Sequence, residues 1–271
     1  MPSGKEAVQK FWNEQPCGAA LAGGAAPGTP EFFQRTQLAR FQNEPFIREF
    51  ARFEQWRGKK VLEVGCGIGV DHSMFARHGA QIVGIDLTPV GAAITAQRLA
   101  YYGVAPRVLV GDSESLPFPD AAFDLVYSWG VIHHTPNTPK AASELLRVVR
   151  PGGSVVAMIY NRRSLVALQA YIVYGLLRGR ASAPVSELIA NHLESPGTKA
   201  YTVREARALF AGLNNLRSTS LVTPYDLRIG RHRALPRWLG TLVPRQLGYF
   251  LVIEGTKPER TSGPSPGLAR E

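Results

Sequence analysis

The chain has 271 residues, of which 45% are hydrophobic and 19% are charged, and its net charge is +10. This composition supplies enough apolar residues to bury the core of one large domain with a cap or insertion, and it favours that division over two domains. The charge is uneven, because residues 161–271 hold 16 Lys and Arg against 7 Asp and Glu, whereas residues 1–160 hold 15 against 14. This excess of positive charge in the second half of the chain is therefore informative about binding partners and not about the fold.

Cysteine usage and hydropathy exclude several classes of protein. Cys17 and Cys66 lie in different regions without the spacing of metal ligands, which argues against disulfides and against a zinc site, so no metal is expected. Residues 1–10 are polar and do not resemble a signal peptide. No run reaches the roughly 20 apolar residues of a membrane span. We therefore expect a soluble protein in a reducing, cytoplasmic setting.

Residues 1–57 predict an N-terminal helical cap. A short aromatic segment with Phe11 and Trp12 leads into a Gly/Ala/Pro-rich loop that ends near Pro30. Residues 31–56 carry apolar side chains at helical spacing, interrupted before Pro45, which predicts two helices in series. These helices either cover the glycine-rich loop that follows or only cover a sheet edge, and their aromatic side chains either wall an acceptor site or serve packing.

Residues 58–160 alternate apolar strands with helices of about ten residues. Strands are predicted at 60–65, 81–86, 106–110, 123–128 and 154–160, and helices at 70–78, 88–102 and 138–149. This alternation predicts an α/β fold with a parallel, doubly wound sheet, in which ligands bind at the carboxyl ends of the strands.

The segment 65–69, Gly-Cys-Gly-Ile-Gly, separates the first strand from the first helix of that series. Glycines at such a turn let the backbone adopt φ > 0 and lie close to a ligand, and the helix amides attract an anionic group. A dinucleotide fingerprint, however, requires Gly or Ala where Val70 stands. Asp71 is expected to repel a diphosphate, and Glu63 suits a cationic or amine-bearing ligand.

Two further carboxylates follow the next strands. Asp86 ends the second strand and can accept both ribose hydroxyls of NAD or of another adenosine ligand. Asp112 follows the third strand and is placed to accept a hydrogen bond from the exocyclic amine of adenine. These residues alone leave the adenosine ligand open.

The ordered series Glu63–Gly69, Asp86, Asp112, 123–130 and 145–153 resembles the class I S-adenosylmethionine-dependent methyltransferases, in the ubiquinone/menaquinone-biosynthesis-like (type 11) branch. The resemblance covers about residues 58–160. It implies a Rossmann-like, doubly wound, seven-stranded sheet, mostly parallel with an antiparallel last strand. It also implies S-adenosylmethionine as cofactor and a small organic acceptor.

The same resemblance assigns cofactor contacts residue by residue. The glycines would pass under the methionine part, with Glu63 near its amino group, Asp86 on the ribose and Asp112 on the adenine amine. The complete set that it implies is Glu63, Gly65, Cys66, Gly67, Gly69, Asp86, Leu87, Asp112, Ser113 and Trp129.

Candidate catalytic residues follow the fourth and fifth strands. His133 and His134 stand at the carboxyl edge, where an imidazole can remove a proton from a phenol, an acid or an activated carbon. One of the two can equally tie the loop to the backbone. Tyr160, at the end of the fifth strand, either acts chemically or shapes the pocket.

The regular alternation stops at residue 161. Residues 161–201 are too long for an ordinary connection and predict a substrate cap. Within it, residues 165–177 form an apolar helix whose plainest role is buried packing, with a lid, a dimer contact or a lipophilic surface as alternatives. His192, Glu194 and Tyr201 are candidates for lining the acceptor pocket.

Residues 202–257 are expected to complete the core, with a capped helix at 202–210 and strands at 216–222 and 249–255. Residues 258–271 have the composition of a disordered tail. An arginine cluster (Arg228, Arg231, Arg233, Arg237) suits an anionic acceptor or an anionic membrane surface, whereas no module for nucleic acid is found.

The functional prediction is methyl transfer to an oxygen of a phenol or carboxylate. Carbon methylation of a lipophilic quinone-like or isoprenoid compound is the alternative within the class. An NAD-dependent oxidoreductase and a non-catalytic binding protein are the alternatives from other classes, and both a monomer and a homodimer remain open.

Overall fold

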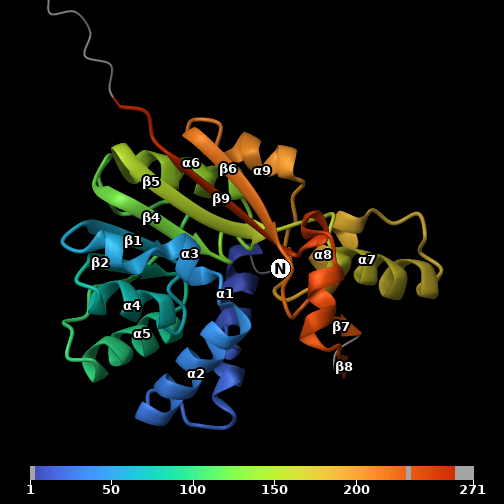
Figure 1. Ribbon diagram of the computed structural model, residues 1–271, viewed down its shortest axis with the longest axis horizontal. Coiled ribbons are helices and arrows are strands. Elements are labelled where there is room, and N and C mark those ends of the chain that lie inside the picture. Colours follow the sequence, from blue (N-terminus) through green and yellow to red (C-terminus); the bar gives the residue numbers. More distant parts are fainter. Residues whose placement is uncertain (1–3, 230–232, 260–271) are drawn as a thin grey trace, which may run out of the picture.

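The structure is a computed structural model that describes residues 4–229 and 233–259. It contains a seven-stranded sheet in the order β3-β2-β1-β4-β5-β9-β6 (Figure 1). The strands pair in parallel from β3 to β5, whereas β9 runs antiparallel to both β5 and β6. The predicted mostly parallel sheet with an antiparallel last strand is confirmed. Most of the predicted tail, residues 260–271, and Arg231 of the arginine cluster lie outside the described residues.

The strands lie close to their predicted positions. Their bounds are β1 (Lys60–Val64), β2 (Gln81–Asp86), β3 (Val108–Val110), β4 (Phe123–Trp129), β5 (Val149–Tyr160), β6 (Asn214–Leu221) and β9 (Phe250–Thr256). The fifth strand begins earlier than predicted, because Val149 already pairs with Phe123 before an irregularity in the register. A short hairpin of β7 (Arg228–Ile229) and β8 (Arg233–Ala234) was not predicted.

The helices between the strands begin at side-chain caps that the sequence supplies. α5 (Pro89–Tyr101) begins after Thr88, α6 (Thr138–Val148) after Asn137, and α9 (Val203–Leu209) after the capping box of Thr202 and Glu205. Such caps satisfy backbone amides that have no partner within the helix. α4 (Val70–Arg77) begins instead at Gly69 in the left-handed conformation.

Two apolar cores cover the two faces of the sheet. On one face, α6 and α9 pack against side chains of β1, β4, β5 and β9. On the other face, α3 (Ile47–Ala51) and α4 pack against alternate residues of the same strands. Figure 1 shows α6 and α9 on the side of the sheet opposite α4 and α5. The sheet is thus the central layer of three.

The N-terminal cap contains α1 (Gly4–Glu14), a 3-10 turn at Ala19–Ala22, α2 (Pro30–Asn43), α3 and a 3-10 turn at Phe53–Trp56. The two predicted helices on either side of Pro45 are therefore confirmed. Phe32 and Phe33 of α2 are buried against Ile68 and Val70. The cap therefore packs on the glycine-rich loop as well as on the sheet.

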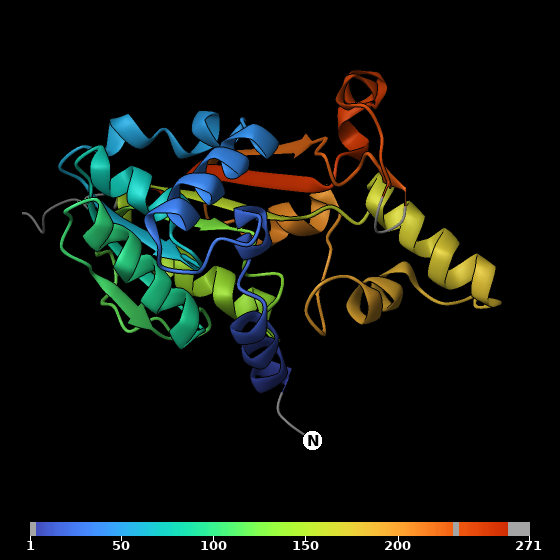
Figure 2. The same cartoon turned by 90° about the horizontal axis from the view of Figure 1, so that it is seen from below.

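The insertion contains α7 (Leu165–Ala170), which continues through a π-helical turn (Tyr171–Gly175) and a 3-10 turn (Leu176–Arg178), and then α8 (Val185–His192). The expectation that this apolar helix is buried is wrong. Leu177 is 76% exposed and Leu168 is 52% exposed. Figure 2 shows the helix projecting from the body of the molecule, so only its base packs on the core.

Two further 3-10 turns, Arg237–Leu242 and Arg245–Leu247, precede β9. Within the described residues, no helix is both long enough and apolar enough to cross a bilayer.

Candidate active site

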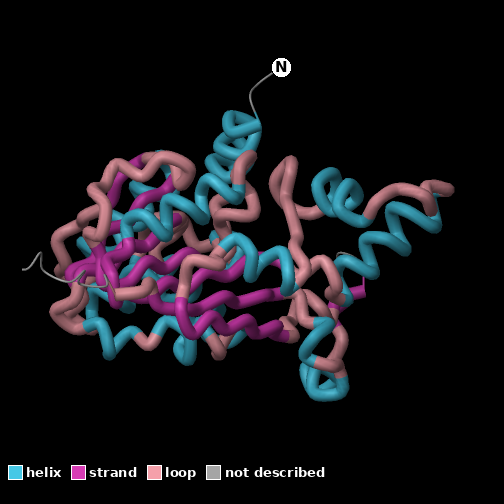
Figure 3. Tube along the Cα trace, turned by 90° about the horizontal axis from the view of Figure 1, so that it is seen from above, coloured by secondary structure: helices cyan, strands magenta, loops and turns pink. Residues whose placement is uncertain are grey.

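A pocket lies at the carboxyl ends of β1, β2, β4 and β5, with residues of α1 and α2 on its wall. Figure 3 shows α1 standing beside this part of the sheet. Eleven of the predicted site residues line the pocket: Glu63, Gly65, Cys66, Gly67, Asp86, Leu87, Asp112, Ser113, Trp129, His134 and Tyr160. Two predicted residues, Gly69 and His133, do not line it. The structure therefore brings together side chains from the first strand to the fifth.

The three glycines of the loop serve different purposes, although all have positive φ. A Cβ at Gly65 would lie 2.2 Å from Val131 Cγ2, and a Cβ at Gly69 would lie 2.7 Å from Thr95 Oγ1. A Cβ at Gly67 would meet no atom within 4 Å. Gly65 and Gly69 are therefore required for packing, whereas Gly67 faces open space. Gly69 begins α4 and does not line the pocket, so its cofactor contact stays a prediction.

Asp86 connects the glycine-rich loop to the helix that follows. Its Oδ2 accepts a hydrogen bond from the amide of Gly67 (2.7 Å), and its Oδ1 accepts from the amide (2.9 Å) and hydroxyl (2.6 Å) of Thr88. A carboxylate has about four acceptor positions, so about one remains for a ligand. Asp86 therefore has less free acceptor capacity than two ribose hydroxyls would use.

The predicted adenine subsite is covered by α1. Lys5 of that helix contacts Asp112 and lies 3.0 Å from Glu114 Oε2, while Gln9 donates to the carbonyl of Leu87 (2.8 Å). Partial burial lowers the pKa of Lys5, but its hydrogen bonds to the two carboxylates outweigh this effect and raise it. Sequence reasoning missed Lys5 because it lies more than a hundred residues from its partners.

A buried ionic network forms the opposite wall. Arg40 of α2 pairs with Asp71 (2.9 Å) and with Glu44 (3.0 Å). Tyr127 donates to Asp71 (3.0 Å), and the indole of Trp129 donates to Glu44 (3.2 Å). Arg40 thus compensates part of the charge of Asp71, from which the repulsion of a diphosphate was predicted.

Glu63 faces His72 at the floor of the site, with 2.9 Å between Oε2 and Nδ1. His72 is fully buried, and this burial lowers its pKa to about 3. Burial, followed by the charge of Asp71, raises the pKa of Glu63 well above its usual range. Burial thus disfavours the charged forms of both partners, and a bound cation would favour the ionised form of Glu63.

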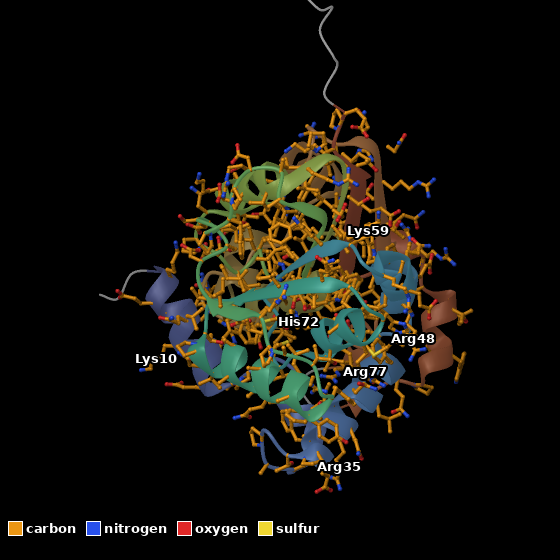
Figure 4. The ribbon with its side chains drawn as sticks, turned by 90° about the vertical axis from the view of Figure 1, so that its left-hand side faces the viewer. Lys10, Arg35, Arg48, Lys59, His72 and Arg77 are labelled. Atoms are coloured by element: carbon orange, nitrogen blue, oxygen red, sulfur yellow. The ribbon has the colours of Figure 1, made fainter. Side chains whose placement is uncertain are left out.

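Figure 4 shows His72 inside the ribbon, whereas the labelled cations Lys10, Arg35, Arg48, Lys59 and Arg77 lie toward the outside, where all five are exposed.

The insertion contributes Glu194 to the same pocket. The hydroxyl of Tyr160 donates to Glu194 Oε2 at 2.6 Å, and Nε2 of His134 lies 3.4 Å from the same oxygen. Nδ1 of His134 lies 2.9 Å from the hydroxyl of Ser195 and 3.0 Å from that of Thr198. Burial, and then the charge of Glu194, raise the pKa of Tyr160 well above its ordinary value. Tyr160 therefore keeps its proton and acts as a donor.

His133 is fully buried behind the pocket wall. Its ring packs on Tyr160 (3.9 Å between centroids) and on His134 (4.1 Å), and neither ring nitrogen has a hydrogen-bond partner among the described residues. Burial, and then the neighbouring His134, lower its pKa well below 6.5. His133 therefore lacks the access that a base requires, and of the two histidines only His134 is placed for that role.

Of the other candidates in the insertion, Glu194 lines the pocket, but His192 and Tyr201 do not. His192 stacks on Tyr174 (4.0 Å between centroids), and Tyr201 packs against the core under α6 and α9.

The pocket is rich in negative charge. It is lined by the carboxyl groups of Glu44, Glu63, Asp71, Asp86, Asp112 and Glu194, against the cations Lys5 and Arg40. Six carboxyl groups around two cations favour a positively charged ligand and disfavour a diphosphate. The conclusion about charge drawn from Asp71 alone is thus supported by the pocket as a whole.

The chain is similar to known methyltransferases in its sequence. Residues 62–157 match the model of a family described as methyltransferase domain. The chain is 40% identical over 110 residues to a probable tocopherol O-methyltransferase of Oryza sativa subsp. japonica, which is 40% of this chain and 30% of that protein. It is 39% identical over 107 residues to the 2-methyl-6-phytyl-1,4-hydroquinone methyltransferase of Synechocystis sp., which is 39% of this chain and 33% of that protein.

Among solved structures, the geranyl diphosphate C-methyltransferase of Streptomyces coelicolor A3(2), bound to S-adenosyl-L-homocysteine, has a TM-score of 0.60 at 17% identity. The alignment covers 94% of this chain and 98% of that one, and it shows the shared fold.

Fold and comparisons together identify a methyltransferase domain at residues 62–157, as the motifs predicted. In this part the chain is similar to the named methyltransferases above. The matched part of the chain spans about a third of the length of the curated relatives.

Proposed function

We propose that the protein transfers a methyl group from S-adenosylmethionine to a small lipophilic acceptor. This proposal rests on the acid-rich pocket at the carboxyl ends of the strands, in which the open face of Gly67 lies beside Asp86. A ligand with a sulfonium and an ammonium group matches this charge, whereas NAD would bring a diphosphate. The negative pocket therefore favours methyl transfer over the oxidoreductase alternative.

The residues fit this cofactor from one end of the pocket to the other. Asp112 offers acceptor oxygens for the adenine amine, Asp86 retains about one position for a ribose hydroxyl, and Glu63 faces the methionine end. The bound cofactor supplies an electrophilic methyl group. The chain contributes alignment of the two reactants and a pocket that excludes water.

An oxygen acceptor is better supported than a carbon acceptor. His134 and Glu194 both line the pocket and can accept a proton, and the proton of a hydroxyl group is more acidic than the proton of a ring carbon. The names of the relatives include both an O-methyltransferase and a hydroquinone methyltransferase, so carbon methylation of a quinone-like compound remains the second candidate. A carboxylate acceptor is disfavoured because it would meet Glu194 in an already negative pocket.

We also propose that the acceptor edge of the molecule rests on an anionic membrane surface. Tyr160 at the end of β5 and Leu221 at the end of β6 both pair with Phe250, so the segments 161–201 and 222–249 leave the sheet at the same edge. Together they hold 10 Lys and Arg against 3 Asp and Glu. These two segments thus hold most of the net positive charge of the sequence.

The same two segments carry apolar side chains in solvent. Leu177 (76%), Leu242 (69%) and Trp238 (63%) are the most exposed of these. Exposed arginines lie among them in the sequence: Arg163, Arg178, Arg180, Arg228 and Arg245. Exposed leucine and tryptophan flanked by arginine suit the interface of an anionic bilayer, from which a lipophilic acceptor can enter the pocket. The cytoplasmic setting expected from the two cysteines stays part of this proposal.

The proposed activity is tested by incubating the protein with methyl-labelled S-adenosylmethionine and a panel of phenols and prenylated hydroquinones. Label in an ether product supports oxygen transfer, and label in a ring-methylated product supports carbon transfer. A protein that binds the cofactor but labels no acceptor in the panel contradicts the proposed acceptor class.

A further inference from the structure

Glu194 differs from every other carboxyl group in the pocket by its surroundings. Glu44 and Asp71 share Arg40, Glu63 faces His72, Asp86 accepts three hydrogen bonds, and Asp112 contacts Lys5. For Glu194, the described residues provide no Lys or Arg partner, only the hydroxyl of Tyr160 and the ring of His134. Its side chain is 39% exposed in the pocket wall and is therefore available to a ligand.

The backbone holds Glu194 in a conformation that is unfavourable for a residue with a side chain. Its φ is +52°, in the left-handed region that non-glycine residues rarely occupy. The fully buried Ser195 and Thr198 follow directly, and the hydroxyl of Thr198 donates to the carbonyl of Ser195 at 2.6 Å. This rigid turn fixes Glu194 beside His134 and Tyr160.

We propose that Glu194 is the catalytic carboxylate that takes the proton from the hydroxyl group of the acceptor, and that the acceptor binds as a neutral phenol. This inference rests on the proposed function and deepens it by naming the proton acceptor and the substrate class.

The lining of the pocket supports a phenol. Near Glu194 the wall consists of the aromatic side chains of Trp12, Trp129, Tyr225 and Phe250 together with Met158. An aromatic ring fits such a wall, and its hydroxyl can donate to the carboxylate. A phenolate or a carboxylate would instead place a second negative charge against Glu194.

The proposed step is balanced in atoms and charge. The acceptor oxygen gains the methyl group, its O–H bond breaks, and the proton goes to Glu194. The bond between methyl and sulfonium breaks with its electron pair left on sulfur, so the positive charge of the cofactor and the negative charge of Glu194 disappear together.

Tyr160 and His134 act as positioning residues. Tyr160 donates to the same oxygen that His134 approaches, which orients the carboxylate. His134 can hold a proton on Nε2 toward Glu194, while Nδ1 accepts from the hydroxyl of Ser195. Its ring can thus take part in moving the proton onward without leaving its place.

The first test uses 4-nitrophenol without cofactor, because its phenol and phenolate forms absorb at different wavelengths. Wild-type protein should bind the neutral form and raise the pKa of the bound phenol. Glu194→Gln should bind it about ten-fold more weakly, as the loss of a charged hydrogen bond predicts, and raise that pKa less. Glu187→Gln, which removes an exposed carboxylate of the same insertion, should behave as wild type. Binding of the phenolate, no binding to wild type, or equal binding by Glu194→Gln overturns the inference.

The second test separates this inference from the proposed function. Glu194→Gln should lower kcat for methylation of the phenol substrate by about 10²–10⁴-fold and should leave the affinity for S-adenosylmethionine nearly unchanged. Tyr160→Phe should lower kcat less than Glu194→Gln does and should move the acidic limb of the kcat/KM profile to higher pH, because the carboxylate loses a stabilising donor. Unchanged kcat in Glu194→Gln overturns the role of Glu194. Absence of cofactor binding in the wild type overturns the proposed function instead.

Discussion

The 2.6 Å hydrogen bond from the hydroxyl of Tyr160 to Glu194 joins the end of β5 to the loop after α8. One partner belongs to the central sheet and the other to the insertion, so the contact joins the insertion to the strand ends that line the pocket. The two halves of the chain thus build one site.

Gly67 and Gly65 make a matched pair of substitutions. Gly67→Ala should weaken binding of S-adenosylmethionine by more than about ten-fold while costing about 1–2 kcal/mol of stability, since its Cβ would enter open space with positive φ. Gly65→Ala should destabilise more, because its Cβ would lie 2.2 Å from Val131. Calorimetric titration and thermal unfolding measure the two effects. A stable Gly65→Ala protein or full affinity in Gly67→Ala would contradict these assignments.

Lys5 contacts the carboxylate that the adenine amine is expected to use. Cofactor binding should therefore break this contact, and Lys5→Met should bind S-adenosylmethionine up to about five-fold more tightly, as a partly exposed ion pair of at most about 1 kcal/mol allows. Lys10→Met, in the same helix, serves as the control because Lys10 is exposed. Titration of both variants decides the point, and weaker binding by Lys5→Met would show that α1 closes on the ligand through Lys5.

His133 should make folding stability depend on pH. Its pKa in the folded protein lies well below 6.5, so the unfolded chain binds the proton first as the pH falls, and stability is lost below about pH 6.5. Between pH 6.5 and 5 this loss amounts to about 2 kcal/mol. His133→Leu should remove that part of the dependence. Denaturant unfolding across this range measures it, and parallel curves for the two proteins would refute the assignment.

The membrane proposal predicts binding to vesicles of phosphatidylglycerol and phosphatidylcholine that weakens with salt. The double variant Leu177→Asp/Trp238→Asp should bind at least about ten-fold more weakly, because both side chains would leave the bilayer interface. Leu38→Asp is the matched control, since Leu38 is 62% exposed but belongs to α2. Co-sedimentation separates the outcomes, and equal binding by all three proteins argues against this surface.

Local patterns predicted most of the fold. The alternation of strands and helices, the caps at Thr88 and Thr202 and the break at Pro45 depend on neighbouring residues, and the structure contains each of them. The exposure of the helix after Ser164 was not predictable in this way, because an apolar composition does not say whether a partner surface is present.

Only those residues of the site that stand at the ends of strands could be predicted from the sequence. Asp86 and Asp112 lie in the pocket as expected, but their partners Thr88 and Lys5 already occupy part of their acceptor capacity. Lys5 and Arg40 escaped prediction as site residues because each reaches the pocket from the N-terminal cap, distant in sequence, whereas Glu194 was a predicted candidate and does line the pocket. Glu194 had a weak signal, a polar residue within a loop of the insertion, and only the geometry beside Tyr160 gives it a role.

Calorimetric titration with S-adenosylmethionine and with NAD tests the central claim most directly. The wild-type protein should bind S-adenosylmethionine and not NAD, and Asp86→Ala should weaken that binding strongly because both the glycine-rich loop and the ribose contact depend on this carboxylate. Binding of NAD without binding of S-adenosylmethionine would contradict the account.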